Sequence, residues 1–103
     1  MLTSKQRAFL RAQANSLEPI WYAGKGGLTE AMVRQGDDAL TARELIKGKV
    51  LESAPASARE TAEALAAATH SEVVQVIGRT FVLYRKNPKE PKIVLPRDRG
   101  GKT

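Results

Sequence analysis

A glycine-rich segment at residues 24–27, Gly-Lys-Gly-Gly, contains the residue types best suited to holding a ligand. It follows an apolar run at residues 20–23, typical of a short strand, and it precedes Thr29, which is suited to capping a helix. Glycines lack a Cβ atom, so the backbone can turn sharply and a ligand can approach its amides closely. Amides at a helix start, with the ammonium group of Lys25 beside them, favour a phosphate. The corner alone is weak evidence, because ordinary tight turns have the same composition.

A pair of lysines could extend such a phosphate site. Residues 45–51 alternate with a period of two, which predicts a strand, and Lys47 and Lys49 then project from the same face. If helices leave that face open, two ammonium groups lie near each other. Taken alone, the pair is more commonly explained as the polar side of a half-exposed strand.

Two arginines near the N-terminus are further candidates. Residues 3–14 predict a helix that begins with a capping box formed by Thr3 and Gln6. Arg7 and Arg11 are four residues apart, so they share one face of this helix. They could contact phosphates, or they could be an ordinary charged outer face.

A β-hairpin is predicted near the C-terminus. Two runs of strand-forming residues, 73–77 and 80–85, are separated by Gly78-Arg79, and a two-residue loop with glycine first favours a type II′ turn. Arg79 would then point to solvent from the tip. The predicted register pairs Ile77 with Thr80, Val76 with Phe81, Gln75 with Val82 and Val74 with Leu83.

The remaining periodic segments complete a mixed fold. Helices are predicted over residues 29–42, with Gly36 on the buried side, and over residues 57–70, where His70 is a capping or surface residue. The order helix, strand, helix, strand, helix, strand, strand predicts a two-layer α/β domain with a four-stranded mixed sheet and three helices.

Charge and composition limit the classes of function. The 103 residues suit one domain, and the net charge is +6. Residues 79–103 hold eight basic and two acidic residues, whereas the first 78 hold nine of each, so the C-terminal quarter carries the whole excess. Such a segment attracts a polyanion, nucleic acid first, or is simply a solvated tail.

The longest apolar run has five residues, at 64–68, so we expect a cytoplasmic protein without a membrane partner. Residues 98–103 are expected to be a disordered basic tail.

No catalytic set is recognisable in the sequence. The chain has no cysteine and one histidine, and Pro96 stands where the first glycine of a P-loop ending in Gly101-Lys102-Thr103 belongs. We therefore expect no enzyme activity, no metal and no cofactor. A protein-interaction module remains the alternative to nucleic-acid binding. In that case the basic C-terminal segment binds an acidic partner. Truncation after Arg85 should then impair function, whereas Lys25→Ala should leave function unchanged.

The blocks of the sequence also resemble a known family. The blocks are residues 24–29 (Gly-Lys-Gly-Gly-Leu-Thr), 44–47 (Glu-Leu-Ile-Lys), 75–78 (Gln-Val-Ile-Gly), 82–85 (Val-Leu-Tyr-Arg) and 92–96 (Lys-Ile-Val-Leu-Pro). In this order they resemble the CRM domain, in particular its stand-alone bacterial form, the YhbY/YqeI-like proteins. One departure is Gly48, where the family more often has a larger apolar residue.

The resemblance implies a single RNA-binding domain over residues 1–97. It implies that the partner is ribosomal RNA or a pre-ribosomal particle during assembly of the large subunit, and that the GxxG loop contacts RNA. We expect a monomer. The candidate RNA-binding residues are Gly24, Lys25, Gly26, Gly27, Lys47, Lys49, Arg79, Arg7 and Arg11. Trp21 or Tyr22 could stack on a base, but alternation sends the two side chains to opposite faces, and the sequence leaves open which of them packs in the core.

Overall fold

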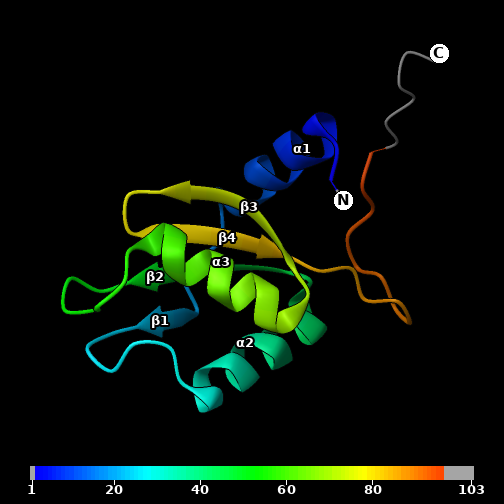
Figure 1. Ribbon diagram of the computed structural model, residues 1–103. Helices are drawn as coiled ribbons and strands as arrows, with labels where there is room; N and C mark the ends of the chain where they lie inside the picture. Colours follow the sequence, from blue (N-terminus) through cyan, green and yellow to red (C-terminus); the bar gives the residue numbers. More distant parts are fainter. Residues whose placement is uncertain (1, 97–103) are drawn as a thin grey trace.

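The computed structural model describes residues 2–96, and over this range the chain forms three helices and one four-stranded sheet (Figure 1). The helices are α1 (Ser4–Ala14), α2 (Glu30–Arg43) and α3 (Ala58–Thr69), and the strands are β1 (Trp21–Ala23), β2 (Leu45–Val50), β3 (Glu72–Ile77) and β4 (Thr80–Tyr84). The strand order is β1-β2-β4-β3; β1 is parallel to β2, and the other neighbours are antiparallel. The predicted fold class and element order are confirmed. The predicted tail at 98–103 lies outside the described residues.

The helix boundaries follow from capping residues that the sequence already indicates. Thr3 and Ser57 each begin a helix with a complete capping box, and the side chain of Thr29 accepts a hydrogen bond from the amide of Met32. His70 ends α3 in the left-handed conformation, with φ 58°, and its side chain is exposed. The prediction of a capping or surface role for this histidine is confirmed.

The larger core lies between the sheet and the pair α2 and α3. Trp21, Phe81 and Leu83 of the sheet pack there against Leu40 of α2 and Leu65 of α3. α2 can approach α3 closely because Gly36 has no side chain. A Cβ atom at this position would lie 3.1 Å from Cδ1 of Leu65 on α3.

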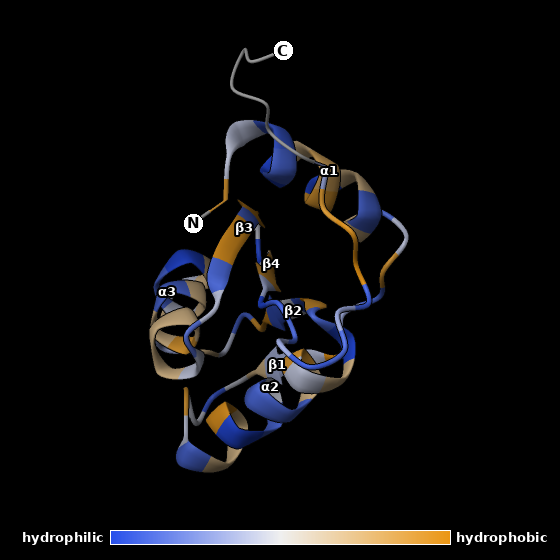
Figure 2. Ribbon diagram, turned by 90° about the vertical axis from the view of Figure 1, so that its right-hand side faces the viewer, coloured by the Kyte–Doolittle hydropathy of each residue, from blue (hydrophilic) through white to orange (hydrophobic). Residues whose placement is uncertain are grey.

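A second, smaller core lies on the opposite face of the sheet. Leu10 of α1 packs there with Val82 and Tyr84 of β4, and Ile93 and Leu95 of the C-terminal segment pack against this group. Figure 2 shows α1 and α3 on different sides of the strands. The two-layer arrangement thus holds for the sheet with α2 and α3, and α1 covers part of the other face.

The hairpin register agrees with the prediction only near the turn. Ile77, Val76 and Gln75 pair with Thr80, Phe81 and Val82 as predicted. Beyond them the prediction is wrong, because the register shifts between Val73 and Gln75 and Leu83 pairs with Val73. The extra residue, Val74, is therefore turned to the core under α1 rather than to the larger core.

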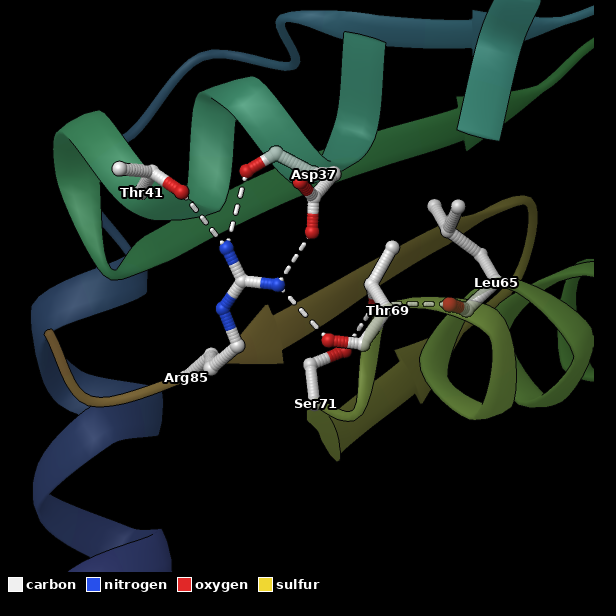
Figure 3. Close-up of polar contacts among 6 residues, drawn as sticks. All are labelled: Asp37, Thr41, Leu65, Thr69, Ser71 and Arg85. Carbon is white, nitrogen blue, oxygen red and sulfur yellow. Dashed lines mark hydrogen bonds and ion pairs between the residues drawn. The ribbon is translucent and has the colours of Figure 1, made fainter. Parts of the chain in front are cut away.

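Arg85, which the sequence places in the basic C-terminal quarter, is an internal clamp. Its Nη1 atom donates to Oδ1 of Asp37 at 2.6 Å and to the carbonyl oxygen of Thr69 at 2.7 Å. Its Nη2 atom donates to the carbonyl oxygen of Asp37 at 3.0 Å and to Oγ1 of Thr41 at 2.8 Å (Figure 3). One guanidinium group thus joins α2, the end of α3 and the end of β4.

Glu44 fastens the C-terminal segment to the domain. This residue is fully buried after α2, and its carboxylate accepts hydrogen bonds from the amides of Asn87 (2.6 Å), Lys92 (2.7 Å) and Ile93 (2.7 Å). Burial tends to raise the pKa of Glu44, but the three amides and the charge of Lys92 outweigh it and lower the pKa below its ordinary value. Ile93 and Leu95 of this segment are thereby held against the domain.

Candidate nucleic-acid interface

Three connections meet at one end of the sheet: residues 24–29, residues 51–57 and the hairpin turn at 78–79 (Figure 1). Parallel β1 and β2 bring the first two together, and the amide of Leu51 donates to the carbonyl oxygen of Ala23 at 2.8 Å. The amide of Val50 donates to the carbonyl oxygen of Arg79 at 2.7 Å, which holds the hairpin turn beside them. We call this end, with its three connections, the loop end of the sheet.

The glycine loop is a tight turn that leaves one face open. The amide of Gly27 donates to the carbonyl oxygen of Gly24 at 2.9 Å, and Gly27 has φ +71°, which glycine adopts without strain. Gly26 differs, because its φ is not in the positive region and a Cβ atom there would have no neighbour within 4 Å in the described part of the chain. The fold therefore does not require glycine at position 26, and the space above it is free for a ligand.

The loop also presents donors of the kind a phosphate needs. Among residues 2–96, the backbone amides of Lys25 and Gly26 have no hydrogen-bond partner, and the side chain of Lys25 is exposed. The N-terminus of α2 follows after Thr29, so its partial positive charge lies close to the loop. Two free amides, an ammonium group and a helix start together suit an anionic oxygen.

Lys49 and Lys47 lie on the sheet face that α1 leaves open near the loop end. Lys49 is exposed, and it pairs with Tyr22 of β1 and with Thr80 of β4, so these three side chains form one row across the sheet. Lys47 stands one row further from the loop end and is half-buried. The structure thus brings both lysines to the same face, as predicted, on the strand next to the one that leads into the loop.

Arg79 reaches the loop end by the hairpin turn. Gly78 has φ +57° and Arg79 does not have a positive φ, which fits the predicted type II′ turn. The guanidinium group lies 3.3 Å from a carboxylate oxygen of Glu52, and both side chains are largely exposed. Arg79 therefore lies at the candidate site, and the carboxylate of Glu52 partly neutralises its charge.

Arg7 and Arg11 lie away from the candidate site at the loop end. α1 packs over Leu45, Val74 and Tyr84, at the end of the sheet opposite the loops. The Nη1 atom of Arg7 donates to the carbonyl oxygen of Val73, on the strand farthest from β1. Arg11 is exposed on the same helix. These two arginines therefore lie apart from the loop end of the sheet.

The family to which these features belong is decided by sequence comparison. Residues 2–85 match the CRS1/YhbY (CRM) domain model. The chain belongs to the CRM domain family. The predicted resemblance to this family is thereby confirmed over residues 2–85, a range that contains residues 24–27, β2 and the hairpin.

Individual CRM proteins are similar to this chain over nearly its whole length. It is 46% identical over 96 residues to the Bacillus subtilis protein named "Probable RNA-binding protein YqeI", covering 93% of this chain and all of that one. It is 38% identical to a Haemophilus influenzae protein named "RNA-binding protein", covering 93% and 96% of the two chains. The solution structure of a hypothetical Staphylococcus aureus protein superimposes with a TM-score of 0.78 at 48% identity, covering 93% of this chain and all of the other.

Two side chains of this CRM domain that the sequence did not assign lie beside the lysines. Tyr22 is half exposed, whereas Trp21 is buried, so the structure decides which aromatic residue is accessible. Arg43, in the last turn of α2, lines a pocket of about 230 Å³ together with Lys47 and Ile20. Arg43 carries no local signal, because only the packing of α2 beside β2 brings it to this pocket.

The described part of the CRM domain lacks two other kinds of feature. Among residues 2–96, no helix is long and apolar enough to cross a membrane. Over the same range, His, Asp and Glu side chains do not form a group of three that could hold a metal ion.

Proposed function

We propose that this chain binds RNA at the loop end of its sheet, with the sugar–phosphate backbone held by residues 24–27. The relatives' names support RNA as the ligand, since two of them are named as RNA-binding proteins. The observation that carries the assignment to the loop is the free space above Gly26, next to two amides that have no partner within residues 2–96. A loop of the GxxG kind clamps backbone nucleotides in KH domains by the same means.

The cations at the loop end contribute the electrostatic part of binding in this proposal. Lys25 neutralises a phosphate at the loop, Lys49 and Lys47 lie along the adjacent sheet face, and Arg79 adds a guanidinium group at the hairpin turn. Each phosphate contact releases counterions, so binding weakens with salt, with a log–log slope of about 0.7–0.9 per contact. Arg7 and Arg11 are not part of the proposed site, because α1 lies at the other end of the sheet.

Filter binding of a large-subunit ribosomal RNA fragment across a salt series tests this assignment. Lys25→Glu and Lys47→Glu should each weaken binding and reduce the salt slope by about 0.7–0.9. Lys5→Glu is the matched control, because Lys5 is an exposed residue of α1, which packs at the end of the sheet opposite the loops. Unchanged affinity and slope in both lysine variants would refute the proposed site.

We further propose that the bound RNA is ribosomal, in the cytoplasm, during assembly of the large subunit, with the protein acting as a monomer. This part rests on the resemblance to stand-alone bacterial CRM proteins and on the relatives at 46% and 38% identity. Ultraviolet cross-linking in cells, followed by sequencing of the attached RNA, should recover large-subunit ribosomal RNA above its level in the input. Recovery of messenger or transfer RNA instead would contradict it.

A further inference from the structure

An open strip of the sheet lies directly beside the glycine loop. We define it by two neighbouring rows on the face that α1 partly covers: Tyr22 with Lys49, and Ile20 with Lys47. Tyr22 is 51% exposed and Ile20 is 42% exposed, although both belong to the segment that leads into the loop. The strip therefore presents an aromatic ring and an aliphatic side chain next to two ammonium groups.

The Tyr22 ring is held in place on this face. Its hydroxyl group donates to the carbonyl oxygen of Pro19 at 3.2 Å, which ties the ring along the strand. Trp21 points the other way: it is 3% exposed, its Nε1 atom donates to the carbonyl oxygen of Met32 at 2.9 Å, and it packs edge-on against Phe81. The core thus buries Trp21 and leaves the neighbouring ring of Tyr22 half exposed.

The strip continues into the pocket that Arg43 lines. Ile20 and Lys47 belong to the strip and also line this pocket. The apolar side chains of Leu17 and Leu45 form part of the pocket wall. Its volume of about 230 Å³ leaves room for a flat heterocycle beside the strip. The lining thus combines apolar side chains with the charged groups of Arg43, Lys47 and Glu18.

We propose that the open strip binds unpaired RNA, with Tyr22 stacking on a base of the strand whose backbone the glycine loop holds. This rests on the proposed function and adds the class of RNA: single-stranded rather than duplex. Two observations favour this occupant: the charge of Lys49 and Lys47 complements phosphate, and the strip is continuous with the loop through β1. Aromatic side chains beside a basic groove are the usual platform for unpaired bases, whereas duplex RNA keeps its bases stacked internally.

Fluorescence titration of the full chain with a short single-stranded oligoribonucleotide carrying 2-aminopurine tests the stacking. The wild-type protein should change the 2-aminopurine emission on binding, and Tyr22→Phe should bind equally well because the ring is kept. Tyr22→Ala should weaken binding about 5- to 150-fold, as expected for one lost base–aromatic stack. The salt slope should stay unchanged in Tyr22→Ala, since no phosphate contact is removed, whereas Lys49→Ala should lower it.

The controls separate this inference from the proposed function. Val94→Ala changes an apolar side chain that is 85% exposed on the C-terminal segment and should bind as wild type does. Circular dichroism verifies that the Tyr22 variants keep the wild-type thermal midpoint. Equal binding by Tyr22→Ala and wild type, or a preference for duplex over single-stranded RNA, would overturn the stacking and leave the loop site standing. Failure of the wild-type protein to bind either RNA at low salt would overturn both.

Discussion

Gly48 of β2 lies directly under the ring of Phe81 on β4, its partner in the antiparallel pair. A Cβ atom at Gly48 would lie 2.8 Å from Cε1 and 3.0 Å from Cε2 of that ring, and closer still to Cζ. Phe81 thus fills the space that a larger residue at position 48 would occupy. The apolar volume at this point of the core is thus supplied across the strands rather than along β2.

Gly48→Ala should therefore destabilise the protein. The added methyl group must displace the buried ring, and overpacking of this kind costs about 1–3 kcal/mol. For a domain of this size each kcal/mol lowers the thermal midpoint by roughly 4–8 °C, so a clear shift is expected in a calorimetric scan. Gly48→Ala combined with Phe81→Leu should recover part of the loss. A single variant as stable as wild type would show that the ring does not fix this position.

Glu44 should make stability depend on pH in the acid range. The folded state lowers its pKa relative to the unfolded value of about 4.3, so the carboxylate contributes stability above that pH. This contribution is lost as the pH falls through the folded pKa. Glu44→Gln should lower the free energy of unfolding at pH 7 by roughly 1–3 kcal/mol, because buried amides lose acceptors.

Urea unfolding of both proteins from pH 7 to pH 3 measures the difference that Glu44 makes. The gap between wild type and Glu44→Gln should be constant from pH 7 to about pH 5 and should narrow below about pH 4. A gap that closes between pH 7 and pH 5 would mean that burial dominates and raises the pKa of Glu44 instead.

Arg85 should not tolerate replacement by lysine. The planar guanidinium group serves four acceptors on α2 and at the end of α3, and an ammonium group cannot reach them from the same position. Arg85→Lys should cost roughly 1–3 kcal/mol, chiefly because the carbonyl oxygen of Thr69 loses its donor. Lys86→Arg is the control, since Lys86 is exposed. Urea midpoints of the two variants decide whether Arg85 acts as a clamp.

The basic residues at the two ends of the sheet should differ in their effect on RNA binding. Lys86 and Lys89 lie on the segment after β4, away from the loop end. Lys86→Glu with Lys89→Glu should leave the salt slope nearly unchanged, whereas Lys25→Glu with Lys49→Glu should lower it by about 1.4–1.8. The reverse result in a filter-binding assay would place the RNA contacts on the C-terminal segment and contradict the site at the loop end.

Local signals in the sequence were enough to predict most of the elements. Capping residues placed α1, α2 and α3, and alternation placed β2 and the turn of the hairpin. The bulge at Val74 was not predictable, because a strand of valines gives the same period on either face and only the core under α1 selects the shift.

The parts of the site that the sequence could not place depend on tertiary packing. In the sequence, Arg85 belongs to the basic C-terminal quarter. In the fold, its guanidinium group is hydrogen-bonded to Asp37 and Thr69 and is largely buried. Arg7 and Arg11 have the spacing of a phosphate-binding pair, and only tertiary packing shows that their helix lies at the other end of the sheet from the loops. The choice between Trp21 and Tyr22 needed the knowledge of which face α2 and α3 cover.

The most direct test of the loop site compares Gly26→Asp with Gly26→Ala. Neither change should unfold the protein, because a Cβ atom at Gly26 would have no neighbour within 4 Å among residues 2–96 and φ there is not positive. Both thermal midpoints should stay within a few degrees of wild type. The carboxylate of Gly26→Asp, standing where the phosphate binds, should abolish binding of ribosomal RNA, while Gly26→Ala should retain part of it. Wild-type affinity in Gly26→Asp, with its thermal midpoint unchanged, would contradict the account.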